Sequence, residues 1–305
     1  MALYIVALQE GFLYGILALG IYISLRVLNL PDLTTEGSFG FGAAIAAVTA
    51  AAGHPVLSLP LALLAGAAAG LVTGLLQTKL KIHPVLSGII TMNGLYTVNL
   101  MVLGTTNLSI GNSNSLFRLL YAGIKLTILQ KRMVGAAAGA VIGLAALLLM
   151  ILFFKTHLGM CIRATGDNPD MVRASSINAD STKLAGLCLS NALVALSGAL
   201  IVHYSGYADV NASSGTLVYG LAAVIIGEAV FGRSGPTRGL IAAMAGSVIY
   251  KLIVTLVVDI DLFGDQSANM MKLMCALIVA FTLAVPAAKQ YIRQRKLMQE
   301  AKKNA

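Results

Sequence analysis

The sequence alternates between long apolar runs and short polar or basic segments. Most of these runs approach the length of about 20 residues that an α-helix needs to cross a bilayer. We therefore expect an all-α integral membrane protein with about nine membrane-spanning helices, within bounds of eight and ten. The expected spans are Leu3–Leu25, Leu33–Ala51, Leu57–Leu76, Pro84–Leu103, Met133–Phe154, Leu184–Tyr204, Leu217–Phe231, Leu240–Val258 and Ala268–Pro286.

The composition supports a membrane protein and argues against a soluble one. Of the 305 residues, 58% are hydrophobic and only 11% are charged, against about 25% charged residues in a typical soluble domain. The first apolar run has no basic segment before it and contains Glu10, so we expect it to remain as a membrane helix instead of being a cleaved signal peptide.

The basic residues predict an orientation in the membrane. If the C-terminal tail is cytoplasmic, most of the 21 Lys and Arg residues fall on the same side of the nine spans. The expected organisation is a transmembrane domain at 1–288 and a basic cytoplasmic tail at 289–305, in a multi-pass protein of the cell membrane. Asp259, Asp261 and Asp265 would lie in an outer loop. This topology accounts for the net charge of +9 without a nucleic-acid partner.

Two of the expected spans are short and rich in glycine, which suggests broken or re-entrant helices. The segment Asp32…Gly37-Ser38-Phe39 that opens one of them resembles Asp209…Gly215-Thr216-Leu217, which opens the other. The two are the second and the seventh expected spans, which are separated by an odd number of membrane crossings. The two halves would therefore cross the membrane in opposite directions, as in the inverted repeats of transporters. Chance similarity between Gly- and Ala-rich helices is the alternative explanation.

The loop between the fifth and sixth spans, residues 159–178, predicts a short helix with defined ends. Asn168 is a good N-cap, and Pro169 suits the first helical position because that position needs no N–H group. Asp170 is favoured by the helix dipole and is spaced to pair with Arg173.

Three further features complete this prediction. Gly166 is expected in a turn before the helix, the helix is expected to end near Ile177 and Asn178, and Ser181 is expected to cap the sixth span. One face of the helix would carry Met171, Ala174 and Ser175. A plain connector between two spans would not need such compact start and stop signals.

Polar residues inside the spans are candidates for a substrate pathway, because each needs a partner or water there. Hydrogen bonding between helices is an equally good explanation for them. Glu228 could also pair with Arg233 at the membrane surface. The candidates are Thr34, Glu36, Ser38, Asn93, Thr97, Ser190, Asn191 and Glu228.

Several kinds of chemistry lack their motifs in this chain. There is no G-x-x-x-x-G-K-[ST] loop for ATP phosphates, no clustered catalytic set and no spacing typical of metal ligands. We therefore expect neither an enzyme nor a metal site. An ion-coupled secondary transporter is one function that embedded acids and an inverted repeat would suit, but it would not need the short, well-capped helix expected after Asn168.

The motifs together resemble a known family. The stretch Arg163–Pro169, with Leu189-Ser190-Asn191-Ala192-Leu193 after it, is similar to the permeases of the branched-chain amino acid and ribose ABC importers. Leu28–Phe39, Lys79–Ile82 and Gly227–Gly232 resemble in particular the subgroup that works with tryptophan- or tyrosine-binding lipoproteins.

The resemblance implies a function for the chain and a set of partners. The chain would form the translocation pathway for a small solute, with aromatic amino acids first and branched-chain amino acids second. A separate ABC ATPase subunit would bind ATP and Mg²⁺, a substrate-binding lipoprotein would deliver the solute, and two copies of the permease would pair. The implied coupling helix, which docks on the ATPase, falls on Gly166, Asp167, Asn168, Pro169, Asp170, Met171, Arg173 and Ala174.

Overall fold

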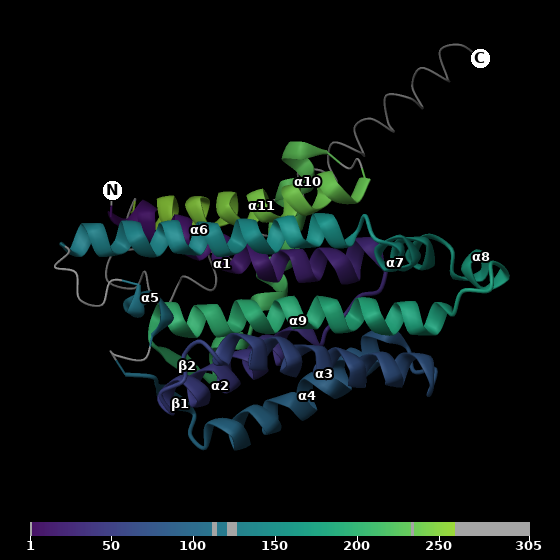
Figure 1. Cartoon of the computed structure of the whole chain (residues 1–305), viewed down its shortest axis with the longest axis horizontal. Coiled ribbons are helices and arrows are strands. Elements are labelled where there is room, and N and C mark those ends of the chain that lie inside the picture. The colour runs from purple at the N-terminus through teal and green to yellow at the C-terminus, as the bar shows by residue number, and fades with distance from the viewer. Residues whose placement is uncertain (1, 112–114, 121–126, 233–234, 260–305) are drawn as a thin grey trace, which may run out of the picture.

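The computed structural model describes residues 2–111, 115–120, 127–232 and 235–259, and long helices dominate it (Figure 1). Among these described residues, seven helical segments are long and apolar enough to cross a membrane: Leu3–Val27, Ser58–Thr78, Pro84–Leu103, Ile128–Phe153, Ala179–Ser205, Val210–Phe231 and Gly235–Asp259. The chain is thus a multi-pass membrane protein.

The elements follow the chain in a simple order. The long helices are α1 (Ala2–Tyr22), α2 (Thr35–Ala51), α3 (Ser58–Thr78), α4 (Pro84–Leu103), α6 (Ile128–Phe153), α9 (Ala179–Ser205), α10 (Thr216–Phe231) and α11 (Gly235–Asp259). A π-helical turn, η1 (Ile23–Val27), extends α1, and a 3₁₀ turn, η2 (Val210–Ser213), precedes α10. The short helices are α5 (Leu116–Leu119), α7 (His157–Asp167) and α8 (Pro169–Ala174).

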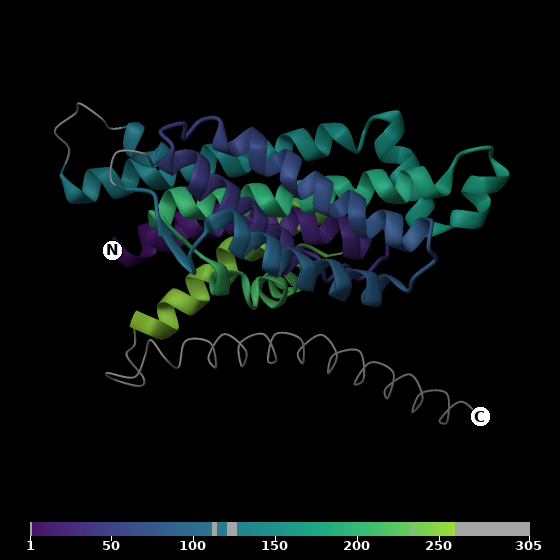
Figure 2. The same cartoon turned by 90° about the horizontal axis from the view of Figure 1, so that it is seen from below.

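The two ends of the bundle differ. At one end, strands β1 (Asn107–Ser109) and β2 (Tyr207–Asp209) form an antiparallel ribbon, which the sequence did not predict; we call this the ribbon end. At the other end, α7 and α8 extend the structure, and Figures 1 and 2 both show α8 projecting beyond the long helices. We call this the α8 end.

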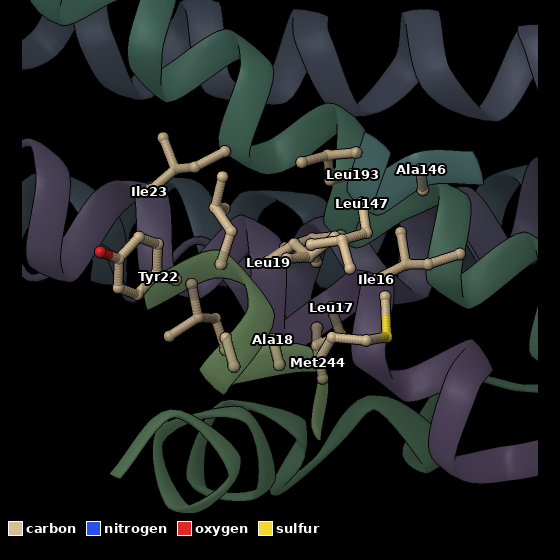
Figure 3. Close-up of a cluster of buried hydrophobic side chains, with 14 of the residues drawn as sticks. Ile16, Leu17, Ala18, Leu19, Tyr22, Ile23, Ala146, Leu147, Leu193 and Met244 are labelled. Carbon is tan, nitrogen blue, oxygen red and sulfur yellow. The ribbon is translucent and has the colours of Figure 1, made fainter. Parts of the chain in front are cut away.

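The core is built around α1, α9 and the helices that cover them. Ile16, Leu17, Leu19 and Ile23 are almost completely buried, and α1 packs against α6, α9, α10 and α11 (Figure 3). Glycines allow the backbones to approach: a Cβ at Gly70 of α3 would collide with the Leu187 carbonyl oxygen of α9. Such close contact replaces the hydrophobic effect as the source of helix association in a bilayer.

Helices α2 and α10 are the two short spans, with 17 and 16 residues. Their starts lie close together, because the backbone N–H of Gly215, just before α10, donates a hydrogen bond of 2.9 Å to the Glu36 carboxylate in the first turn of α2. They run in opposite directions: α2 ends beside the ribbon, whereas α10 ends at the α8 end. Asp32 before α2 and Val210 before α10 are buried, each 4% exposed. Short helices were therefore correctly predicted, and the internal repeat itself stays a prediction.

The expected spans compare well with these helices where the two can be compared. The first eight runs each coincide with a helix, although the sixth helix begins at Ala179, before the expected Leu184. The ninth run at 268–286, the tail at 289–305, and Asp261 and Asp265 lie outside the described residues.

Candidate functional site

Helix α8 has the N-cap that its sequence predicts. The side-chain oxygen of Asn168 accepts hydrogen bonds from the backbone N–H groups of Asp170 at 3.1 Å and Met171 at 3.0 Å. Pro169 occupies the first helical position, and the Arg173 guanidinium lies 3.2 Å from the Asp170 carboxylate. These local interactions confirm the predicted start of the helix and its predicted ion pair.

Three details of this loop were predicted wrongly. Gly166 lies within helix α7, not in a turn, and α8 ends at Ala174, before the expected Ile177 and Asn178. The cap of α9 is Asn178, whose side chain accepts from two backbone N–H groups, instead of Ser181. Asn and Ser are both good capping residues, so only the packing of α9 decides which of the two positions begins the helix.

One face of α8 is anchored and the other is open. Val172 is 2% exposed and holds the helix against the body of the protein, while Met171 is 60% exposed. Ala174 and Ser175 are also exposed. An exposed apolar residue next to small residues, on a short and well-capped helix, is suited to docking into a groove of another protein.

Helix α7 connects α8 to the end of α1. The carbonyl oxygen of Gly166 accepts a hydrogen bond of 2.9 Å from the Asn29 side chain, and its Cα packs directly on the Val27 carbonyl oxygen. The Thr165 and Thr182 hydroxyls are 2.7 Å apart, which ties α7 to α9. A displacement of α8 would thus reach η1 through closely packed backbone.

An ion pair lies where η1 meets α10. Arg26 Nη2 is 2.7 Å from Glu228 Oε2, and the Glu228 side chain is only 7% exposed. Arg163 and Asp167 of α7 line the same cavity of about 320 Å³. Glu228 thus pairs with Arg26, which is 202 positions away in the sequence. Arg233, which the sequence also offers as a partner of Glu228, lies outside the described residues.

Four of the predicted pathway residues are buried in contacts between helices. Asn191 donates to the Asp32 carboxylate at 2.7 Å and accepts from the Ser38 hydroxyl at 2.7 Å. The Thr34 hydroxyl meets Thr73 of α3 at 2.8 Å, and Ser190 donates to the Gly20 carbonyl oxygen at 2.7 Å. In this conformation these four residues form hydrogen bonds between packed helices.

Three others are accessible. Glu36 and Asn93 line a cavity of about 250 Å³ together with Tyr96 and Asn99. Thr97 is exposed on the same helix, α4, one turn beyond Asn93. The structure thus brings Glu36 of α2 and the polar residues of α4 together, whereas Glu228 stands apart at the α8 end.

A second embedded ion pair escaped the sequence analysis. Lys251 Nζ of α11 is 2.7 Å from Glu10 Oε2 of α1, and both side chains are at least three-quarters buried. The same ammonium lies 4.6 Å from the ring centre of Tyr14 and 5.6 Å from that of Tyr219. The sequence does show an acidic and a basic residue within apolar runs, which could have suggested an ion pair. However, 241 positions separate the two residues, so nothing in the sequence connects them.

Comparison with known proteins decides the family. Residues 4–283 match the family model described as the permease component of branched-chain amino acid transport systems. The chain belongs to this permease family. It is therefore a transport subunit and not an enzyme, in agreement with the resemblance read from its motifs.

The relatives of this permease transport different solutes. It is 34% identical to a tyrosine transport system permease protein of Clostridioides difficile, over 91% of this chain and 89% of that one. It is 28% identical to a probable branched-chain amino acid transport permease of Methanocaldococcus jannaschii, over 61% of both chains. An autoinducer 2 import system permease of Yersinia enterocolitica is 27% identical over 78% of this chain and 63% of that one. No solved structure matches the permease significantly.

Proposed function

We propose that the permease forms the translocation pathway of an ATP-driven importer for aromatic amino acids. The observation that carries this proposal is the capped and exposed helix α8, anchored by Val172 and joined through α7 to the membrane core. The choice of solute is supported by the tyrosine transport permease, with which this chain aligns over most of its length. A separate ATPase subunit supplies the ATP and Mg²⁺ chemistry, and an extracytoplasmic binding lipoprotein delivers the solute.

The charge distribution supports a cytoplasmic α8 end. Short cytoplasmic segments of membrane proteins are enriched in Lys and Arg. At the ribbon end, the described basic residues are Arg118, Lys131 and Arg132. At the α8 end, they are Arg26, Lys79, Lys81, Lys155, Arg163, Arg173, Lys183 and Arg238. The ATPase would thus approach α8, and the binding lipoprotein would approach the ribbon.

Coupling follows from the contacts of α7. When the ATPase moves α8, the α7 backbone presses on Val27, because a glycine at position 166 leaves no space between them. Since η1 carries Arg26, movement of η1 strains the Arg26–Glu228 pair that joins α1 to α10. Opening this pair would release the end of α10 on the cytoplasmic side. A π-helical turn suits this role, because such turns are less regular than the α-helix and frequently mark functional sites.

A homodimer is supported by the exposed face of α4. Asn93, Tyr96 and Thr97 lie on this helix, and Tyr96 is 49% exposed. Polar side chains in membrane helices avoid lipid and face protein or water. We therefore place a second copy of the permease, and the water-filled pathway between the copies, against α4.

Reconstitution tests the function directly. The permease would be incorporated into proteoliposomes with its ATPase and binding lipoprotein, and uptake of L-tyrosine, L-tryptophan and L-leucine would be measured. We expect uptake of the aromatic amino acids, and we expect it to require ATP on the side of the membrane where the ATPase is bound. Ionophores should not affect this uptake. Uptake that follows a sodium or proton gradient without ATP would instead establish an ion-coupled secondary transporter.

A further inference from the structure

The ribbon half of the permease contains a charged and aromatic cavity that none of the predicted sites includes. Its volume is about 270 Å³, close to the lower end of the ~300–1,000 Å³ range of small-ligand sites. The Glu10–Lys251 pair lies at its wall. Tyr14, Phe39 and Tyr204 provide the aromatic surface, and Gly40 and Gly198 also line the cavity.

Both charges lie well inside the bundle. Glu10 is eight positions from the beginning of α1 and Lys251 is eight positions from the end of α11, which is about 12 Å along each axis. Ionisable residues at such depth are costly in a membrane protein, and they usually mark a pathway for substrate or ions. The packing of α1 against α11 does not by itself require a charged pair.

We infer that the Glu10–Lys251 pair and the surrounding aromatic rings bind the zwitterion of an aromatic amino acid as it enters the permease. This inference rests on the proposed function and names the residues that would recognise its substrate. The ammonium of the substrate would pair with Glu10, and the carboxylate would pair with Lys251. One internal ion pair is exchanged for two, so no charge is left unpaired in the membrane during binding.

The aromatic rings favour the side chain of the same substrate. Tyr14 and Phe39 are stacked nearly parallel, with ring centres 6.0 Å apart, and Tyr14 lies 4.7 Å from Tyr219. A further aromatic ring in the cavity would gain contacts with Tyr14, Phe39 and Tyr204, which line it. An aliphatic substrate would fill the same space without this gain.

The experiment uses purified permease in lipid nanodiscs, without its partners, and saturation-transfer NMR. The probes are L-tyrosine, tyramine, which lacks the carboxylate, and 3-(4-hydroxyphenyl)propionate, which lacks the amine. We expect L-tyrosine to bind at least about tenfold more tightly than either analogue, because each analogue leaves one charge of the pair without its new partner. Absence of L-tyrosine binding, or equal binding of tyramine, would overturn the inference.

The matched variants separate recognition from structure. The double variant Glu10→Gln/Lys251→Met removes both charges together and should keep the unfolding temperature, since no single buried charge remains. It should bind L-tyrosine at least about tenfold more weakly. The control Tyr4→Phe/Asp259→Asn removes a 3.0 Å contact between the same two helices outside the cavity, and it should bind normally. Unchanged binding in the charge-free variant would show that the pair is structural.

A third variant covers the case in which the charge-free protein does not fold. Tyr204→Ala keeps both charges of the ion pair, and it removes one aromatic wall together with the hydroxyl that hydrogen-bonds Glu10. Its loss of L-tyrosine binding would support the inference, and unchanged binding would contradict it. ATP-dependent uptake by the wild-type complex tests the proposed function separately, so uptake without binding at this cavity would refute only the inference.

Discussion

At the scale of residues, buried polar side chains of the permease form hydrogen-bonded networks between helices. Asn191 is the clearest junction: it donates to Asp32 and to the Leu187 carbonyl oxygen, and it accepts from Ser38. Asp32 also accepts from the Thr34 backbone at 2.9 Å. These bonds join α9 to the segment that starts α2, so they fix where this short helix begins inside the bundle.

Replacing Asp32 should therefore destabilise the protein. Asp32→Ala leaves the backbone N–H of Thr34 and part of the Asn191 amide unsatisfied, at a cost of about 2–3 kcal/mol. Thermal unfolding in detergent should show a clearly lower midpoint. The control Asp170→Ala removes a carboxylate that is 87% exposed, and it should cost only about 0.5 kcal/mol. Equal midpoints for the two variants would refute the role of the network.

A substitution at Gly166 tests the contact between α7 and η1. A Cβ at this position would collide with the Val27 carbonyl oxygen, so Gly166→Ala must push α7 away from η1. We expect a stability loss of about 1–3 kcal/mol and weaker coupling between ATP hydrolysis and uptake. The control Gly139→Ala places its Cβ 3.2 Å from the flexible Gln9 side chain and should be mild. The two substitutions would behave alike if this packing carried no function.

The sequence predicts residues best where the determining contacts are local. The Asn168 cap and the Asp170–Arg173 pair depend on neighbours within three positions, and both were predicted correctly. The partners of Glu10 and Glu228 depend on how distant helices pack. No periodicity along the chain could pair them, so both ion pairs were missed.

At the scale of elements, apolar length predicts the helices and packing sets their ends. Eight runs became helices because each can satisfy its own backbone hydrogen bonds in lipid. The depth at which α2 and α10 begin depends on the contact between Glu36 and Gly215, which connects parts of the chain 179 positions apart. The π-helical turn at η1 and the ribbon of β1 and β2 likewise arise from tertiary contacts, so their sequences alone gave no signal.

The ion pair between η1 and α10 leads to a prediction at this scale. Glu228→Ala leaves the Arg26 guanidinium, which is 30% exposed, without its carboxylate. We expect a loss of about 2–3 kcal/mol, below the ~3–5 kcal/mol of a fully buried pair. The double variant Arg26→Leu/Glu228→Leu should recover most of this stability in detergent unfolding. If the double variant were as unstable as the single one, the pair would not explain the loss.

At the scale of the whole molecule, the two ends of the bundle suit two different partners. The α8 end is basic and carries an exposed short helix, whereas the ribbon end opens toward the cavity beside Glu10 and Lys251. The polar face of α4 provides a third surface, between the ends. The charge pattern along the sequence predicted the first of these surfaces, and the sequence also offered Asn93 and Thr97 of the third as candidates. The cavity beside Glu10 and Lys251 required the packed structure.

If a second copy packs against the exposed face of α4, a bulky residue on this face should prevent dimer formation. A Cβ at Gly94 has no neighbour within 4 Å, so Gly94→Trp should leave the isolated permease folded but block a second copy. Native mass spectrometry should then show monomers where the wild-type protein gives dimers. Val141→Trp is the matched control, because Val141 of α6 is 66% exposed on another helix. Dimers in both variants would place the interface elsewhere.

The central claim is that α8 transmits the movement of an ATPase to the membrane core, and one substitution tests it directly. Ala174→Glu places a larger, charged side chain on the exposed docking face, with Ala174→Ser as the control. In the reconstituted complex, we predict that Ala174→Glu abolishes both uptake and receptor-stimulated ATP hydrolysis while the unfolding temperature of the permease is unchanged. Wild-type uptake and stimulation in this variant would show that α8 is only a connector and would contradict the account.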